Sequence, residues 1–81
     1  MANFTRRDVK TVEDSLRLFG RENNIQIGID DSDNRPNVYR YICYHNESHM
    51  TCMIHIDFEQ VEDLDDSITK SLDFLREYFT L

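Results

Sequence analysis

Glycine and proline are scarce in this sequence, with two glycines and one proline among 81 residues. Because these residues interrupt helices and strands, their scarcity predicts that most of the chain is regular structure. No apolar run approaches the roughly 20 residues of a membrane-spanning helix, and the first ten residues lack a signal-peptide core. Two cysteines are too few for a disulfide scaffold. We therefore expect one small domain, residues 1–81, in the cytoplasm of a bacterial or other host cell.

Basic residues are almost missing from the second half of the chain. Residues 1–40 carry seven Lys/Arg and seven Asp/Glu, whereas residues 41–81 carry two and nine, which accounts for the net charge of −7. The stretch DFEQVEDLDD (57–66) holds six acids and no base. Affinity for nucleic acid and for anionic membranes comes from basic side chains. We therefore expect no direct nucleic-acid binding and no membrane binding, and a basic protein surface as partner.

Motifs for catalysis are also lacking. The sequence has no glycine-rich phosphate loop and no serine or cysteine nucleophile in a recognisable pattern with histidine. Asp31 and Asp33 resemble the start of a calcium loop, but Arg35 and Pro36 stand where a ligand and a glycine are needed. We expect no enzyme, no catalytic residue and no cofactor.

The stretch CYHNESHMTC (43–52) places Cys43, His45, His49 and Cys52 within ten positions. A structural zinc site usually combines ligand pairs from separate parts of the fold, whereas these four come from one short segment. Cysteine on the apolar face of a strand commonly serves as a small hydrophobic residue. We interpret the stretch as a hairpin tip without a metal. A disulfide between Cys43 and Cys52 stays open, because a non-hydrogen-bonded pair would allow it.

Residues 4–24 predict a helix with both ends marked. Thr5 can act as N-cap with Asp8 as its capping-box partner, and the exit falls at Gly20 and Asn23–Asn24, residue types that tolerate left-handed geometry. The apolar stripe consists of Val9, Val12, Leu16 and Phe19. A second face carries basic side chains with acids among them, which we expect to be largely self-neutralised; these are Arg6, Lys10, Arg17, Arg21, Glu13 and Asp14.

The middle of the chain predicts three strands. IQIGI (25–29) alternates isoleucine with smaller or polar residues, and 30–37 is rich in turn formers. VYRYICY (38–44) and MTCMIHI (50–56) predict a hairpin centred on Glu47–Ser48. With that centre, the numbers of opposite residues sum to 95, so Cys43 faces Cys52. One sheet face then carries Tyr39, Tyr41, Cys43, His45, Met50, Cys52, Ile54 and Ile56; the other carries Arg40, Ile42, Tyr44, Thr51, Met53, His55 and Asp57.

The last segment, from about Glu59 to Phe79, returns to a helical period. Its start is uncertain, because Asp57, Asp63 and Asp65 are each possible N-caps. The main apolar stripe consists of Val61, Leu64, Ile68, Leu72, Leu75 and Phe79, and Phe74, Tyr78 and Leu81 extend it sideways. The predicted fold class is α+β, in the order α-β-β-β-α: a three-stranded antiparallel meander with two helices packed on one face.

Two surfaces are candidate partner-binding sites. The acidic surface lies on and before the last helix and consists of Glu59, Glu62, Asp63, Asp65, Asp66, Asp73 and Glu77. The sheet-face patch consists of Arg40, Ile42, Tyr44, Met53 and His55, which are residue types favoured at interfaces. A solvated helix face and a homodimer seam are the corresponding structural interpretations.

These surfaces support three hypotheses about function. The first is a small acidic inhibitor or adaptor that imitates nucleic acid and blocks the basic groove of a nuclease or other nucleic-acid enzyme. Its size and charge are similar to those of phage anti-restriction and anti-CRISPR proteins, bacteriocin immunity proteins and some antitoxins, with no shared motif. The alternative is a homodimeric structural or assembly subunit that uses the sheet-face patch. The third is an RNA-binding module, since α-β-β-β-α is the order of the double-stranded-RNA-binding domain, although EDLDD (62–66) stands where that domain needs bases.

Overall fold

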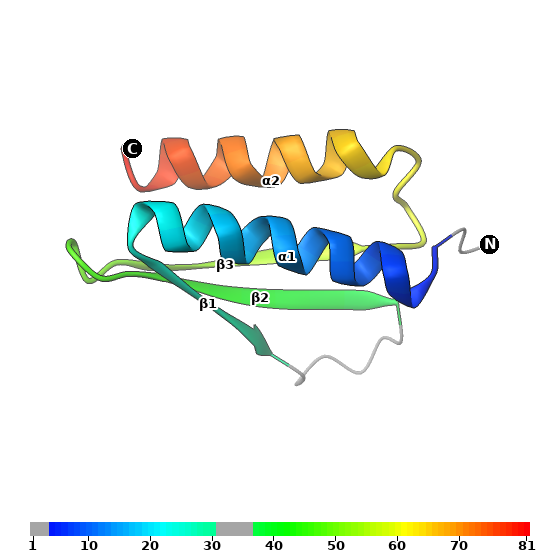
Figure 1. Cartoon of the computed structure of the whole chain (residues 1–81), viewed down its shortest axis with the longest axis horizontal. Coiled ribbons are helices and arrows are strands. Elements are labelled where there is room, and N and C mark those ends of the chain that lie inside the picture. Colours follow the sequence, from blue (N-terminus) through cyan, green and yellow to red (C-terminus); the bar gives the residue numbers. More distant parts are fainter. Residues whose placement is uncertain (1–3, 31–36) are drawn as a thin grey trace.

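The computed structural model describes residues 4–30 and 37–81. Within them, the chain forms helix α1 (Arg6–Asn23), strands β1 (Ile25–Asp30), β2 (Val38–His45) and β3 (Thr51–Asp57), and helix α2 (Leu64–Tyr78) (Figure 1). The predicted α+β class and the α-β-β-β-α order are confirmed. Most of the predicted loop at 30–37, including the calcium-like pattern, lies outside the described residues.

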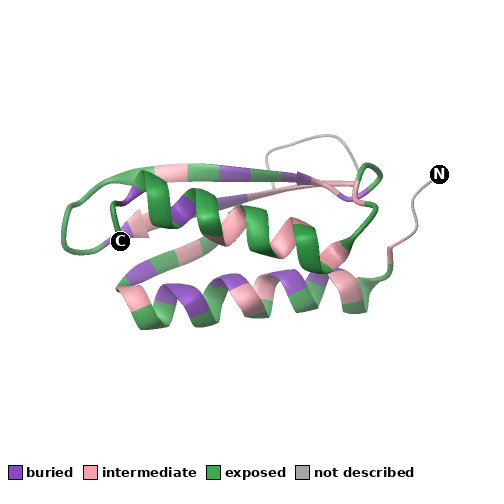
Figure 2. Cartoon of the chain, turned by 90° about the horizontal axis from the view of Figure 1, so that it is seen from above, coloured by how far each residue is buried: buried purple, intermediate pink, exposed green. Residues whose placement is uncertain are grey.

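The three strands form one antiparallel sheet in the order β1-β2-β3. The predicted register of the hairpin is confirmed, with Tyr39 opposite Ile56, Tyr41 opposite Ile54 and Cys43 opposite Cys52. Both helices lie on the same face of the sheet and run side by side (Figures 1 and 2). The result is a two-layer domain with principal extents of 40 × 25 × 18 Å.

Helix α1 begins as its local sequence predicts. The Thr5 hydroxyl accepts a hydrogen bond from the Asp8 amide, and the Asp8 carboxylate accepts one from the Thr5 amide. Asn24 ends the helix in the left-handed region at φ 59°. Gly20, in contrast, does not mark the exit but stays helical and buried. A methyl group there would overlap the Ile25 carbonyl oxygen, so glycine is needed because α1 passes close to β1.

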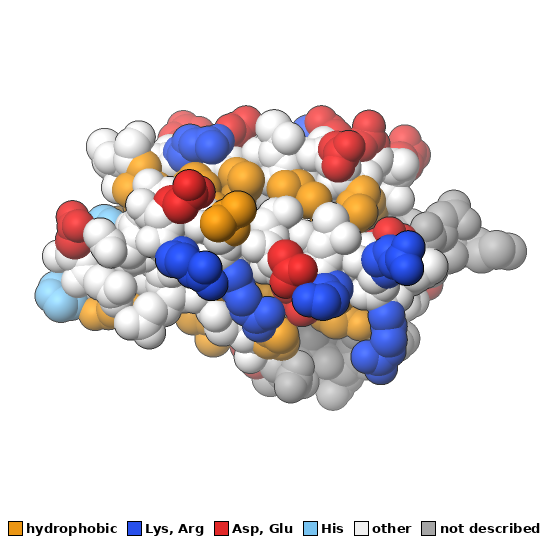
Figure 3. Space-filling view, in the orientation of Figure 1, with side chains coloured by type: hydrophobic (Ala, Val, Ile, Leu, Met, Phe, Trp, Pro, Cys, Tyr) orange, Lys and Arg blue, Asp and Glu red, His pale blue; other side chains and the backbone are white. Residues whose placement is uncertain are grey.

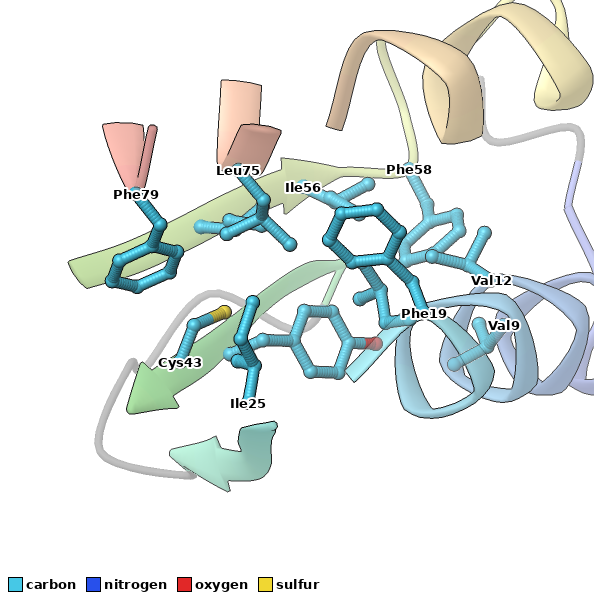
Figure 4. Close-up of a cluster of buried hydrophobic side chains, with 12 residues drawn as sticks. Val9, Val12, Phe19, Ile25, Cys43, Ile56, Phe58, Leu75 and Phe79 are labelled. Atoms are coloured by element: carbon cyan, nitrogen blue, oxygen red, sulfur yellow. The ribbon is translucent and has the colours of Figure 1, made fainter. Parts of the chain in front are cut away.

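The core lies between the helices and the inner face of the sheet (Figure 4). Its largest fully buried side chains are Tyr41, Phe58, Leu16, Leu75, Val12 and Cys43. Phe58 was not predicted to be buried, and it packs against the Phe4 ring at 4.9 Å and the Tyr39 ring at 5.3 Å between centroids. These aromatic contacts close the end of the core where β3 leaves the sheet.

Helix α2 begins at Leu64 with Asp63 as its N-cap, which is one of the three possible N-caps that the sequence left open. Residues 58–60 form a turn instead, in which the Asp57 carbonyl accepts from the Gln60 amide at 2.9 Å. The Asp57 carboxylate also accepts from the Glu59 amide at 3.0 Å. Burial of Phe58 fixes this turn and delays the helix by about one turn beyond the point at which its apolar period begins.

Candidate protein-binding surfaces

The acidic surface divides between α2 and the segment that precedes it. Asp65, Asp66, Asp73 and Glu77 lie on α2, whereas Glu59 and Glu62 lie in the connection and Asp63 caps the helix. All seven residues are exposed. In Figure 3 carboxylates gather along the outer side of α2 at the top, and Lys and Arg gather over α1 below it. A surface over α1 in which basic and acidic side chains are mixed therefore borders a mainly acidic surface along α2.

Few of these carboxylates have a cationic partner. Lys70 pairs with Asp66 and Arg76 with Asp73, each at 2.9 Å and each within α2. The hydrogen bond to Asp66 raises the pKa of Lys70. Across residues 4–30 and 37–81, no ion pair joins an α2 carboxylate to an arginine of α1. The α2 charges are therefore balanced only in part, and only from within their own helix.

Two of the remaining acids, Glu59 and Asp63, make polar contacts that do not neutralise them. The Glu59 carboxylate accepts a hydrogen bond from Asn37 Nδ2 at 2.7 Å, and the Asp63 carboxylate accepts from the Asp66 amide at 3.1 Å. Acceptors with carboxylate charge at the start of a helix interact favourably with its dipole. Asp63 is thus a structural cap in addition to being a candidate contact residue.

Helix α1 also has an ion pair within the helix, but one of its acids is bound to the core. Lys10 pairs with Asp14 at 3.1 Å, and the Glu13 carboxylate accepts a hydrogen bond from the Tyr41 hydroxyl at 3.0 Å. Burial of Tyr41 strongly raises its pKa, and the hydrogen bond to Glu13 is the second cause of this increase. Glu13 therefore supports the core, whereas the α2 carboxylates face solvent.

The sheet-face patch lies on the side of the sheet away from the helices. Ile42 and Met53 are directly opposite each other, with exposed fractions of 37% and 40%. The Tyr44 hydroxyl lies 2.7 Å from His49 Nδ1. Arg40 forms an ion pair with Asp30, and its side chain is only 23% exposed. Arg40 therefore belongs to an ion pair within the sheet. The apolar pair and His55, which is exposed opposite Arg40, are the parts of the patch open to a partner.

The hairpin tip holds two free thiols. Burial raises the pKa of Cys43 to about 12 and also raises that of Cys52. His45 is buried, with Nδ1 2.7 Å from the Ser48 hydroxyl and its ring 5.2 Å from the Phe79 ring. His49 is exposed at the tip. The described part of the chain contains no group of three or more His, Cys, Asp or Glu side chains that could hold a metal.

A groove that the sequence did not indicate runs between β3 and α2. It has a volume of about 620 Å³ and is lined by residues 53–57 of β3, residues 60–63 of the connection, and residues 66, 67, 70, 71 and 74 of α2. The α2 residues recur at helical spacing and share one face of the helix. Ser67, Lys70 and Ser71 lie beside the apolar stripe of α2 and not in it, so the pattern of apolar residues did not mark this face.

Comparisons with protein-family models, with curated proteins and with solved structures give no match for this chain. Neither described helix is long and apolar enough to cross a membrane.

Proposed function

We propose that the chain is a small acidic inhibitor or adaptor that binds a basic protein surface, with the nucleic-acid groove of an enzyme as the favoured target. The observation that carries the proposal is the separation of charge between the helices. Asp65 and Glu77 have no cationic partner among the described residues, and no arginine of α1 forms an ion pair with either of them. Glu77 follows Asp73 by four positions within α2, a spacing at which like charges on a helix repel. A cationic partner would relieve this unfavourable interaction.

Electrostatic complementarity of this kind acts mainly on the rate of association and on specificity. The net charge of −7 attracts a basic surface over a distance of about 8 Å at physiological salt. Once bound, the carboxylates of α2 would occupy positions that the phosphates of a nucleic acid otherwise take. The protein would then compete with nucleic acid rather than bind it.

The test begins with capture of partners from the native cell and their identification by mass spectrometry. Binding of the captured partner is then measured with Asp65→Asn/Glu77→Gln and with the matched control Asp14→Asn/Glu22→Gln. Both pairs remove two negative charges, but from α2 and α1 respectively. We expect the α2 pair to weaken binding about tenfold and the α1 pair to change it by less than about twofold.

Competition with nucleic acid completes the test. Duplex DNA or RNA that the partner binds should displace the protein, and binding should weaken as salt rises. Simultaneous binding of the protein and the nucleic acid would disprove mimicry. Equal affinities for the α1 and α2 variants would disprove a role for the acidic surface altogether.

A homodimeric assembly subunit is the second candidate, and the exposed Ile42–Met53 pair favours it. Burial of such a pair in a dimer removes apolar surface from water at about 25 cal/mol per Å². Light scattering at micromolar concentration distinguishes the two functions. A dimer that dissociates in Ile42→Asp supports the assembly role, and a monomer at that concentration excludes it.

A further inference from the structure

Strand β3 is an edge strand of the sheet in the described part of the chain, because the strand order is β1-β2-β3. The His45 amide donates to the Met50 carbonyl at 2.9 Å, and antiparallel pairs alternate between hydrogen-bonded and non-hydrogen-bonded. Counting by two along the register makes the even-numbered residues of β3 the hydrogen-bonded ones: Cys52, Ile54 and Ile56. The main-chain groups of the odd-numbered residues therefore point away from β2.

A hydrogen bond at the end of β3 supports this assignment. The Tyr78 hydroxyl of α2 donates to the carbonyl of Thr51, an odd-numbered residue, at 3.3 Å. At the other end the Asp57 carbonyl accepts from the Gln60 amide. Between these two capped ends, Met53 and His55 direct their amides and carbonyls outward, and no main-chain partner for them lies within the described residues.

The open edge lies along the β3–α2 groove, the cavity of about 620 Å³ described above. Natural edge strands are commonly protected by proline, lysine or a bulge, and TCMIHID (51–57) contains neither of these residues. Across the groove, α2 presents Ser67, Ser71 and the 45% exposed ring of Phe74. Small side chains beside an aromatic ring leave room for alternate side chains of an added strand.

The charge of the groove selects the occupant. Four acids line it, namely Asp57, Glu62, Asp63 and Asp66, against the single base Lys70, which Asp66 already pairs. A second copy of this chain paired through β3 would bring two such acid clusters together, so like charges oppose that arrangement. An extended segment in which apolar and basic residues alternate can pair with the main chain of β3 and place cations beside the acids of the groove.

We propose that the β3–α2 groove binds an extended, basic segment of a partner polypeptide, which pairs with β3 as a fourth strand. Main-chain hydrogen bonds from Met53 and His55 hold the added strand, and side chains directed toward the groove supply selectivity. The inference goes beyond the function proposed above, because it requires no nucleic-acid enzyme as partner and no contact with Asp65 or Glu77.

The probe is an acetylated, amidated octapeptide of alternating valine and lysine, and amide hydrogen exchange of the protein is followed by NMR. Saturating peptide should slow exchange of the outward Met53 and His55 amides about tenfold. The inward Ile54 amide, already bonded to β2, should change little. A peptide with proline in place of alternate lysines cannot pair as a strand and should protect neither outward amide.

Matched charge reversals locate the site. Asp66→Lys alters a carboxylate that lines the groove, whereas Asp65→Lys alters its exposed neighbour outside the lining. We expect Asp66→Lys to weaken peptide binding about fivefold and Asp65→Lys to weaken it less than about twofold. In addition, His55→Pro removes one outward amide while leaving the bonds between β2 and β3 in place, and should weaken binding about fivefold.

Three results would overturn the proposal. They are peptide binding without protection of the Met53 and His55 amides, equal effects of Asp66→Lys and Asp65→Lys, and protection of the outward amides that grows with protein concentration in the absence of peptide. The last result would assign the edge to self-association. The groove variants Asp66→Lys and His55→Pro leave Asp65 and Glu77 unchanged, and Asp65→Lys serves only as the control. Failure here therefore leaves the acidic-surface proposal standing, and failure of that proposal leaves this one standing.

Discussion

The two helices cover the same face of one sheet, yet they differ in how deeply they are buried. Helix α1 buries Val9, Val12, Leu16, Phe19 and Gly20, whereas α2 buries only Leu75 within its span. The rest of the α2 stripe is half-buried, including Leu64, Ile68 and Leu72. Figure 2 shows the contrast as purple turns along α1 and largely pink and green turns along α2.

The acidic side chains of the two helices also differ in how far they take part in the fold. Three of the four acids of α1 make contacts within the fold: Asp8 completes the capping box, Glu13 accepts from the Tyr41 hydroxyl and Asp14 pairs with Lys10. On α2, Asp65 and Glu77 hold no cation among the described residues. A helix that is shallowly packed and rich in unbalanced charge contributes less to folding. Helix α1 therefore anchors the domain, whereas α2 keeps most of its charged side chains exposed to solvent.

The largest difference in stability between the two helices is expected for the same truncation, leucine to alanine, made once in each. Leu16→Ala should lower the free energy of unfolding by about 2–5 kcal/mol, because Leu16 is fully buried and its loss leaves a cavity. Leu72→Ala should cost about 1 kcal/mol, because half-buried apolar surface loses less on truncation. Helix propensity cancels between the two changes. Urea denaturation measures both, and equal losses would contradict the assigned roles of the helices.

Local signals explain why α1 and the hairpin could be predicted. The α1 cap is a hydrogen bond between Thr5 and Asp8, three residues apart, and the β2–β3 register follows from side chains that alternate with a period of two. Each of these features is decided within a few residues of sequence. Their prediction therefore required no knowledge of the tertiary structure.

Tertiary contacts explain what could not be predicted. The start of α2 is delayed because Phe58 enters the core beside Phe4, which lies far away in the sequence. Gly20 is needed because α1 approaches the Ile25 carbonyl. The groove exists because α2 packs along the open edge of β3, and only the fold brings those two elements together. The acidic surface, in contrast, was visible in composition alone, although Glu59 and Glu62 proved to precede the helix.

Two buried titratable groups, Cys43 and Tyr41, belong to the core that α1 helps to cover, and they make its stability depend on pH. Cys43 has a folded pKa of about 12, against about 8.5 in an unfolded chain, and burial also raises the pKa of Tyr41. At a pH between the unfolded and the folded pKa of each group, the folded protein keeps the proton that the unfolded chain has lost. Stability should therefore be complete below about pH 8.5 and fall by about 1.4 kcal/mol per pH unit above it because of Cys43. Tyr41 should add a similar slope above about pH 10.

Denaturation at several pH values checks this expectation. Cys43→Ala should flatten the decline between about pH 8.5 and 10, and Tyr41→Phe should flatten the part above about pH 10. Each variant has its own lower stability at neutral pH, so slopes rather than absolute values are compared. A profile of the unmodified protein that stays level up to about pH 11 would contradict burial of both groups.

The smallest expected effect is also the most direct comparison of the two helices, because it removes one glutamate from each. Glu13→Ala leaves the buried Tyr41 hydroxyl without its carboxylate acceptor and should cost about 1–2 kcal/mol. Glu77→Ala removes an exposed charge from the last turn of α2, where the helix dipole disfavours an acid. It should therefore be neutral or stabilising by up to about 0.5 kcal/mol. Thermal denaturation at neutral pH ranks the two variants, and the reverse order would mean that the carboxylate on α2 serves the fold rather than a partner.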